Sequence, residues 1–281
     1  MDPLRDERVA KVVRKQGMKH CCVTPWSFSL VREQEYDGAR LSMRIATNSS
    51  GQLIVGDKYK VKKFDATGQF IQHFSLPNHR NILDVATDNK DNIYVLVVSG
   101  SVYEFSNTAD LHHKFPVVRE GHGLTVTNNK VLVLCKSNVH VYDTDGLFVS
   151  SFGEGTFGKG TFRASSITAA NDGHVMVLDW HDYCVHIFSE DGHHLDKFQI
   201  QGYGYPSIAF HMLSEHVVIV GKEDERNVLV VEIFTKDGIS VRSTEIYTEL
   251  ILPIEGVTVT RDGRIAVVGI SSNVTPKVLV I

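Results

Sequence analysis

The sequence repeats a short pattern five times, at intervals of 37 to 46 residues. In each copy an aromatic residue is followed by three turn-forming residues and then by a small residue. The copies are Phe64–Gly68, Phe105–Ala109, Tyr142–Gly146, Phe188–Gly192 and Phe234–Gly238. A period of roughly 20 to 50 residues is typical of proteins built from units that cannot bury their apolar faces alone. The repeat therefore predicts an array of similar units rather than a single irregular core.

A second pattern precedes each of these copies and also occurs a sixth time. Two apolar runs rich in Val and Ile flank a turn in residues 44–57, 84–97, 124–134, 166–179, 207–220 and 256–269. The turns contain mainly Asn, Asp, Gly and Ser, which accept a left-handed backbone or bond to their own main chain. Helical periodicity is rare along the chain, so we predict an all-β protein.

Each repeat contains four predicted strands. In the first repeat they cover residues 44–46, 53–56, 61–64 and 69–74. The second strands are almost wholly apolar, as expected for strands covered on both faces, whereas the fourth strands carry charges that suit an outer edge. We predict one domain over residues 1–281, a six-bladed β-propeller of four-stranded blades. The predicted blades lie near residues 43–75, 82–116, 123–152, 164–199, 206–244 and 254–281.

The two ends of the sequence suggest how the ring closes. The sixth repeat ends at Ile281 after its third strand and lacks a fourth. Residues 9–15 read VAKVVRK, a strand pattern that belongs to no repeat. We predict that residues 9–15 supply the missing outer strand of the sixth blade, because a closed ring leaves only short, protected sheet edges.

The first and fourth repeats carry the pattern in its most regular form. Each has an apolar strand that ends in Asp57 or Asp179, followed by a Val-x-x-Phe segment that ends at Phe64 or Phe188. This unit resembles the NHL repeat, and residues 9–281 resemble the C-terminal NHL domain of tripartite-motif proteins. The resemblance implies a recognition domain without catalytic activity that binds RNA or a protein. Any ubiquitin ligase activity would belong to a RING domain outside this chain.

Composition excludes several classes of protein. Hydrophobic residues make up 42% and charged residues 22% of the chain, as in ordinary globular domains. No apolar run approaches the roughly 18 residues of a membrane span, and no signal-like segment follows Met1, so we expect a cytoplasmic protein without membrane contact. The net charge of −4 argues against DNA binding by a uniformly basic surface. We expect reduced cysteines, because the four cysteines lack C-x-x-C spacing. We also expect the domain to be a monomer.

Several motifs suggest chemistry that their context does not support. Residues 153–158 read G-x-G-x-x-G, but a predicted strand rather than a helix follows, so we interpret them as a connection between blades. Asp179, His181 and Asp182 lie on one predicted loop and lack a fourth metal ligand at a recognisable spacing. Among the residues that begin the innermost strands, only Asp84 is acidic. We therefore expect no catalytic residues, no metal and no cofactor.

The two faces of a propeller differ in this sequence. The turns after the first and third strands lie on one face, here called the turn face. The connections after the second and fourth strands lie on the other, here called the loop face. Acidic residues outnumber basic ones in the predicted turns of the turn face, which leaves the loop face relatively basic. The candidate binding residues on the loop face are Lys58, Tyr59, Lys60, His79, Arg80, His122, Lys136, Lys159, Arg163, Trp180, His181, Tyr183, Tyr203 and Tyr205.

Two ligands fit these residues. In the first hypothesis the basic side chains contact RNA phosphates while Tyr59, Trp180 and Tyr183 stack on unpaired bases, whether single-stranded or in a stem-loop. RNA affinity would then fall steeply as the salt concentration rises. In the second hypothesis four aromatic residues form a hot spot for a protein partner, such as a substrate of a ubiquitin ligase. They are Trp180, Tyr183, Tyr203 and Tyr205.

Overall fold

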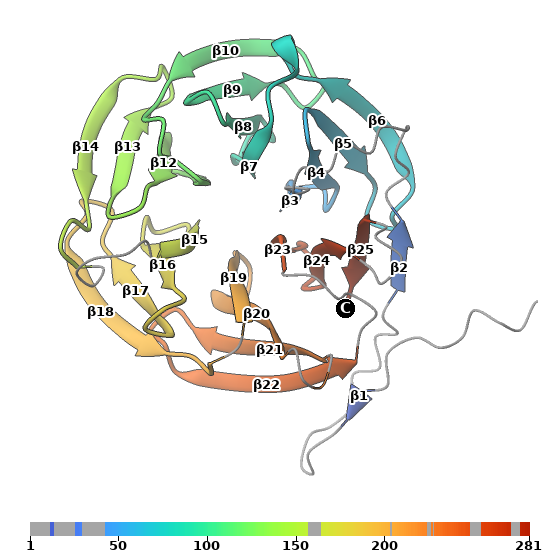
Figure 1. Cartoon of the computed structure of the whole chain (residues 1–281), viewed down its shortest axis with the longest axis vertical. Coiled ribbons are helices and arrows are strands. Elements are labelled where there is room, and N and C mark those ends of the chain that lie inside the picture. Colours follow the sequence, from blue (N-terminus) through green and yellow to red (C-terminus); the bar gives the residue numbers. More distant parts are fainter. Residues whose placement is uncertain are drawn as a thin grey trace, which may run out of the picture.

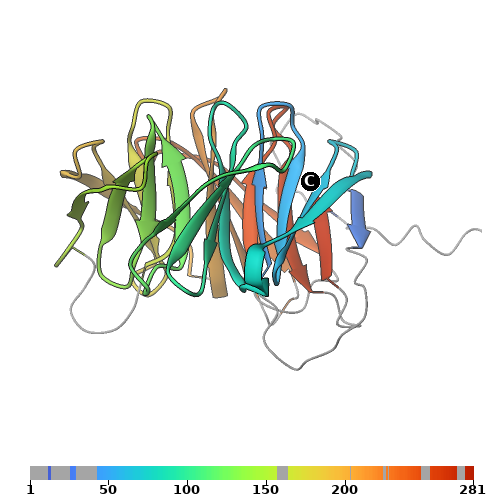
Figure 2. The ribbon, with the colours of Figure 1, turned by 90° about the horizontal axis from the view of Figure 1, so that it is seen from above.

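A computed structural model describes residues 12–13, 26–29, 43–156, 164–202, 204–223, 226, 228–247, 254–270 and 276–281. Six sheets stand around a central axis, and the strands of each sheet follow one another outward (Figure 1). From the side, the inner strands cross the thickness of a disc, and their connections gather at its two faces (Figure 2). The predicted six-bladed, all-β propeller is confirmed. In the described ranges no helix is long and apolar enough to cross a membrane.

The first three blades contain the strands β3 to β14 in chain order. Blade one consists of β3 (Met43–Thr47), β4 (Leu53–Asp57), β5 (Lys60–Phe64) and β6 (Phe70–Ser75), followed by the 3₁₀ helix η1 (Pro77–His79). Blade two consists of β7 (Ile82–Thr87), β8 (Ile93–Val97), β9 (Ser101–Phe105) and β10 (Leu111–Pro116). Blade three consists of β11 (Gly123–Thr127), β12 (Lys130–Leu134), β13 (Val139–Asp143) and β14 (Phe148–Phe152).

The other three blades follow the same order. Blade four consists of β15 (Ala164–Ala169), β16 (Val175–Asp179), β17 (Cys184–Phe188) and β18 (His194–Gln199). Blade five consists of β19 (Gly204–His211), β20 (His216–Glu223), β21 (Val228–Thr235) and β22 (Ser240–Tyr247). Blade six contains β23 (Gly256–Val259), β24 (Ile265–Ile270) and β25 (Pro276–Val280). Neighbouring strands within every blade are antiparallel.

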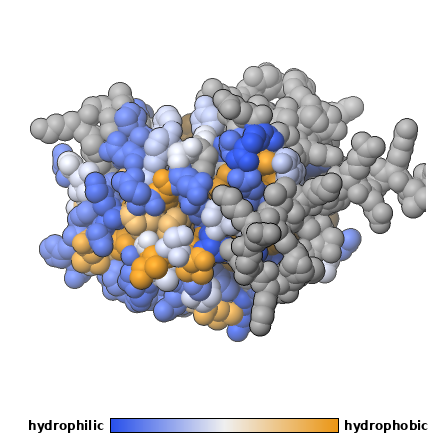
Figure 3. Space-filling view, turned by 90° about the horizontal axis from the view of Figure 1, so that it is seen from below, coloured by the Kyte–Doolittle hydropathy of each residue, from blue (hydrophilic) through white to orange (hydrophobic). Residues whose placement is uncertain are grey.

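The strand order follows from the hydrophobicity of the strands. The second strands β4, β8 and β16 are buried at every residue, whereas the outer strands β6 and β14 are mostly exposed. Six apolar clusters fill the spaces between neighbouring blades, as where Ile54 of blade one packs with Val95 and Tyr103 of blade two. On the side of the disc shown in Figure 3, hydrophobic patches are interspersed with hydrophilic ones. Leu195 of β18 and Val241 of β22 are exposed apolar residues of such outer strands. The core therefore lies between the blades rather than inside any one of them.

The repeated aromatic residue has a structural cause. Each of four such residues, at the end of a third strand, packs against a phenylalanine from the fourth strand of the preceding blade. The pairs are Phe74–Phe105, Phe115–Tyr142, Phe152–Phe188 and Phe198–Phe234, with ring centroids 4.6 to 6.2 Å apart. In three of the four pairs a glycine four residues after the aromatic makes room for the same phenylalanine, whereas Ala109 has this place after Phe105. A Cβ atom on Gly146 would lie 2.2 Å from the Phe115 ring, and φ at Gly146 is +83°.

Ring closure differs from the prediction. β2 (Trp26–Ser29) pairs with β25 and is the outer strand of blade six. Within residues 9–15, β1 (Val12–Val13) instead pairs with β22, as a fifth strand on the edge of blade five. The prediction that residues 9–15 close the ring is therefore wrong. Residues 26–29 lie closer in sequence to Met43, where blade one begins. Pairing them with β25 therefore closes a smaller loop, and closing a smaller loop costs less entropy.

Candidate functional site

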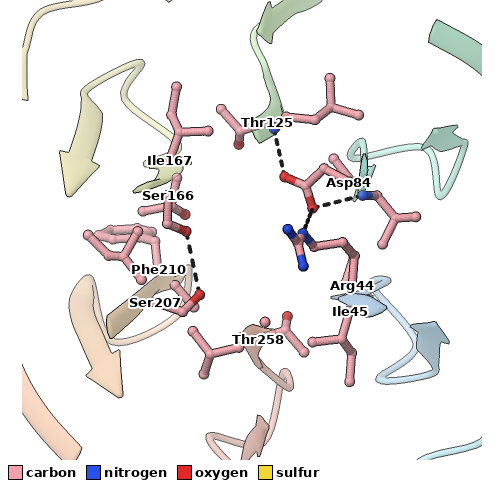
Figure 4. Close-up of a pocket in the computed structure, with 18 of the residues that line it drawn as sticks. Arg44, Ile45, Asp84, Thr125, Ser166, Ile167, Ser207, Phe210 and Thr258 are labelled. Carbon is pink, nitrogen blue, oxygen red and sulfur yellow. Dashed lines mark hydrogen bonds and ion pairs between the residues drawn. The ribbon is translucent and has the colours of Figure 1, made fainter. Parts of the chain in front are cut away.

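The innermost strands surround a central channel with a cavity of about 610 Å³. Each of these strands runs from the loop face to the turn face, so their first residues line the mouth of the channel on the loop face. Arg44 and Asp84 point into the channel from adjacent blades, opposite Ser166 and Ser207 (Figure 4). A cavity of roughly 300 to 1,000 Å³ with a few convergent polar groups is typical of a ligand-binding site.

Blades six, one and two give this mouth a charged wall. The Nη1 atom of Arg44 donates to the carbonyl oxygen of Glu255 at 2.7 Å and to its Oε2 at 3.0 Å. The Nε atom of Arg44 lies 4.0 Å from Oδ1 of Asp84. Both carboxylates and the guanidinium are largely but not fully covered, with side-chain exposures of 19 to 26%. One guanidinium is therefore shared between two carboxylates.

Asp84 joins two blades through its carboxylate. Oδ2 accepts the backbone N–H of Leu124 in blade three at 2.7 Å, and Oδ1 accepts that of Val85 at 2.9 Å. Burial raises the pKa of Asp84 to about 6, although Arg44 and the two N–H donors favour the ionised form. The carboxylate thus has less compensating positive charge than its burial demands.

Blades four and five give the mouth an aromatic wall. The rings of Trp180 and Tyr205 stack with centroids 6.4 Å apart and planes 18° from parallel. Both line the cavity, and both remain solvent-accessible, with exposures of 37% and 60%. Below them the hydroxyl oxygens of Ser166 and Ser207 lie 3.5 Å apart.

The loop that presents Trp180 is held by a buried carboxylate. Asp179 is fully buried, and its Oδ1 accepts the backbone N–H groups of His181 and Asp182 at 3.0 and 3.2 Å. Tyr183 ends the turn with φ of +49°, a conformation that costs energy in residues other than glycine. Asp179 therefore fixes the backbone of this loop, and Trp180 extends from an anchored turn.

The structure brings together only some of the predicted binding residues. His122, Trp180 and Tyr205 line the channel mouth, and His181 and Tyr183 flank Trp180 in the same turn. The others lie on separate parts of the loop face: Lys58 and Tyr59 between β4 and β5, Lys60 at the start of β5, Arg80 after η1, and Lys136 between β12 and β13. The side chain of His79 and the whole of Lys159, Arg163 and Tyr203 lie outside the described residues.

The described part of the loop face is less basic than predicted. Its described connections and the strand residues beside them carry basic and acidic side chains in similar numbers: Lys58, Lys60, Arg80, Arg119, Lys136 and Arg226 against Asp57, Glu120, Glu154, Asp179, Asp182, Glu223 and Glu255. Arg226 is paired with Glu223 and also, at 2.8 Å, with Glu245. The ammonium of Lys58 lies 5.6 Å from the centroid of the Tyr59 ring. The predicted excess of positive charge is not seen in this part of the face.

Metal-ligand clusters and reactive cysteines are two common features of active sites, and neither is found among the described residues. The described residues contain no group of three or more His, Cys, Asp or Glu side chains placed to hold a metal ion. Cys135 and Cys184 are buried free thiols, and burial raises their pKa values to about 12 and 11. Thiols with such pKa values are poor nucleophiles near neutral pH.

The Arg44–Glu255 contact was missed by sequence reasoning. Among the first residues of the innermost strands, Asp84 is the only acidic one, because the equivalent position in blade six is Gly256 rather than Glu255. Glu255 precedes that position by one residue, yet both its backbone carbonyl and its side chain reach Arg44. One feature of the sequence could have indicated this contact. Arg44 occupies the equivalent position in blade one, and an arginine that lines a channel suggests a carboxylate nearby.

Fold and site together define this chain as a six-bladed β-propeller with a polar and aromatic channel mouth. Its fold is similar to that of U3-55K, at 11% sequence identity and a TM-score of 0.65, over 97% of this chain and 98% of that one. A streptogramin B lyase matches at 12% identity and a TM-score of 0.62, over 91% and 96%. The WD40 β-propeller domain of Doa1 matches at 14% and 0.59, over 84% and 77%. No protein-family model and no curated sequence matches the chain.

Proposed function

We propose that this propeller is a recognition domain without catalytic activity, which binds a protein partner over the channel mouth on the loop face. The observation that carries the proposal is the stacked pair Trp180–Tyr205, two large rings left accessible at the rim of a cavity. Tyr183, in the same turn as Trp180, is 38% exposed and adds a third ring. Clustered aromatic side chains beside a pocket are typical energetic centres of protein interfaces.

The charge distribution favours a protein over RNA as the partner. Neutralisation of phosphates supplies a large share of the affinity in nucleic-acid binding and needs accessible Lys and Arg side chains. On the described loop face the acidic side chains match the basic ones, and Arg226 is already paired with two glutamates. Within the resemblance to tripartite-motif proteins, this corresponds to a domain that recruits a substrate to a ubiquitin ligase.

RNA remains the second candidate on a specific observation. Lys58 extends beside the ring of Tyr59 in the turn between β4 and β5, which places a cation next to a stacking surface. Arg80 and Lys136 lie on other connections of the same face. Such a combination suits single-stranded RNA, whose bases stack on aromatic rings while the backbone contacts cations.

The proposal is tested by quantitative affinity capture from cell extract with the wild-type chain, Trp180→Ala and the control Leu213→Ala. Leu213 is an exposed apolar residue, at 65%, in the turn between β19 and β20 on the turn face. Proteins captured by the wild type should be reduced about tenfold or more by Trp180→Ala. They should be retained by Leu213→Ala and should survive ribonuclease. Each is then purified and its affinity is measured directly.

The same experiment separates the two candidates. Capture that ribonuclease abolishes, together with salt-dependent RNA binding that Lys58→Glu weakens, would support RNA and overturn the protein proposal. Equal capture by the wild type and Trp180→Ala would also overturn it.

A further inference from the structure

We propose that the channel mouth receives a basic side chain, lysine or arginine, from the partner protein. This inference rests on the proposed function and specifies which part of the partner enters the cavity. The observation behind it is the pairing of two unlike walls across one opening, the charged wall of Arg44, Asp84 and Glu255 and the aromatic wall of Trp180 and Tyr205.

The charged wall is short of positive charge. It contains two carboxylates and one guanidinium, all mostly covered from solvent, so its net charge is negative. The Nη1 atom of Arg44 is already engaged by the carbonyl oxygens of Met43 and Glu255 and by Oε2 of Glu255. Asp84 is only within 4.0 Å of the guanidinium. In a partly desolvated site an added cation interacts with such carboxylates more strongly than it would in water.

The electrostatics of Asp84 point the same way. Its pKa lies well above the usual range because burial outweighs the stabilisation from Arg44 and from the N–H groups of Leu124 and Val85. A carboxylate in this state gains from a second cation nearby, whereas an anionic ligand would raise its pKa further. The site therefore discriminates against acidic groups.

The aromatic wall suits the remainder of a basic side chain. Aromatic ring faces attract ammonium and guanidinium groups within about 6 Å, and arginine most often. The aliphatic part of lysine or arginine also packs well on rings while its charged end reaches a polar group. The hydroxyls of Ser166 and Ser207 lie on this side of the channel and offer acceptors for the N–H groups of the ligand.

The experiment uses three small probes that differ in charge: acetyl-arginine-amide, its uncharged counterpart acetyl-citrulline-amide, and acetyl-glutamate-amide. Binding to the full chain is followed by ¹H–¹⁵N NMR, at the indole of Trp180 and at the amide of Leu124, which is bonded to Asp84. We expect saturable shifts at both groups with the arginine probe. Equal affinity for the citrulline probe, tighter binding of the glutamate probe, or no shift at either group would overturn the inference.

Variants test whether the charged wall is responsible. Glu255→Gln and Asp84→Asn should each weaken the arginine probe about tenfold. Glu154→Gln, which removes an exposed carboxylate elsewhere on the loop face, should leave its affinity within about twofold. Glu255→Gln keeps the test valid if Asp84→Asn, which alters a contact between blades, fails to fold. An unchanged affinity in folded Glu255→Gln would contradict the proposal.

A final comparison separates this inference from the proposed function. A purified partner identified by capture should bind Glu255→Gln about tenfold more weakly than the wild type, and replacement of one of its Lys or Arg residues should have the same effect. If the partner loses binding to Trp180→Ala but binds Glu255→Gln normally, the proposed function stands. The inference that a basic side chain enters the channel mouth is then overturned. The inference would fail in the same way if the arginine probe bound but the partner were indifferent to Glu255→Gln.

Discussion

The turn face and the loop face are products of the same repeat, yet they differ in what their side chains contact. On the turn face, short turns are closed by their own carboxylates, as where Oδ1 of Asp88 accepts the N–H groups of Lys90 and Asn92. Other side chains there link neighbouring blades: Ser49 bonds to Asp91, and Lys130 pairs with Glu190 at 3.0 Å. On the loop face the exposed rings of Trp180 and Tyr205 contact one another beside an open cavity.

This contrast shows that the two ends of one repeat can serve different roles, stability at the turn face and binding at the loop face. Because turn-face residues hold the ring together, changes there should affect stability. Because the loop-face rings of Trp180 and Tyr205 contact one another and remain exposed beside the cavity, changes to them should affect binding instead. Asp84 and Arg44 are exceptions. Both lie at the loop-face end of the channel, and Asp84 joins blades two and three while Arg44 joins blades one and six.

The largest expected effect separates two glycines that share a left-handed backbone. Gly146 on the turn face has φ of +83° and no space for a Cβ atom beside Phe115, whereas Gly155 on the loop face has φ of +76° and nothing within 4 Å. Gly146→Ala should lower the free energy of unfolding by about 3 kcal/mol, from backbone strain and overpacking. Gly155→Ala should cost only the strain, about 1 kcal/mol. Urea denaturation measures both, and equal costs would contradict the contrast between the faces.

The next effect concerns two carboxyl groups with opposite pKa shifts. Burial raises the pKa of Asp84 to about 6, so the folded state holds this proton more tightly than the unfolded state, in which the value is near 3.8. The stability from this group is complete below pH 3.8 and is lost as the pH rises through about 6. The pKa difference between the folded and unfolded states is about two units, which corresponds to a loss of about 3 kcal/mol in the free energy of unfolding. Asp172 on the turn face behaves in the opposite way.

Although burial alone would raise the pKa of Asp172, hydrogen bonds from Lys236 and His174 lower it to about 2. Its contribution to stability is therefore present above pH 3.8 and is lost as the pH falls through about 2. Unfolding free energies of the wild type, Asp84→Asn and Asp172→Asn are measured from pH 2 to 8. Asp84→Asn should remove the decline between pH 4 and 6, and Asp172→Asn should flatten the profile below pH 4. Identical profiles for the two variants would refute the assignment.

The smallest expected effect is on the partly exposed ion pairs of the turn face. Lys130→Ala and Lys236→Ala remove partners of Glu190 and Asp172, and each should lower the free energy of unfolding by less than about 1 kcal/mol. The effect should shrink in high salt, because mobile ions screen exposed charges. Neither change should alter partner binding, and a large loss of binding by either would show that the turn face also takes part in recognition.

The fold was predictable because its signals are local. Turn residues and apolar runs recur within each repeat, so the blades and the inner position of their first strands can be read from short stretches of sequence. The strand that closes the ring was not predictable. Two segments, Val12–Val13 and residues 26–29, have equally plausible strand patterns, and only the geometry of the ring distinguishes them.

The candidate site was predictable only in its parts. Trp180 and Tyr205 were expected on the loop face, but their stacking depends on how blades four and five lie against each other. Arg44 and Glu255 are 211 residues apart and meet because the ring closes. Neighbouring charges likewise cancel in ways that a count by loop does not capture, as where Arg226 meets Glu245 from the outer strand of its blade.

The aromatic pairs between blades have a consequence for how such a chain is assembled from modules. Because Phe115 is matched to Tyr142 and Gly146 of the following blade, a visible sheet such as β7–β10 is not self-contained. The segment that carries both halves of one such match runs from the outer strand of one blade through the turn after the third strand of the next, here Leu111 to Gly146. Duplication, deletion or grafting with boundaries drawn there would preserve every matched pair, whereas boundaries drawn between sheets would separate them.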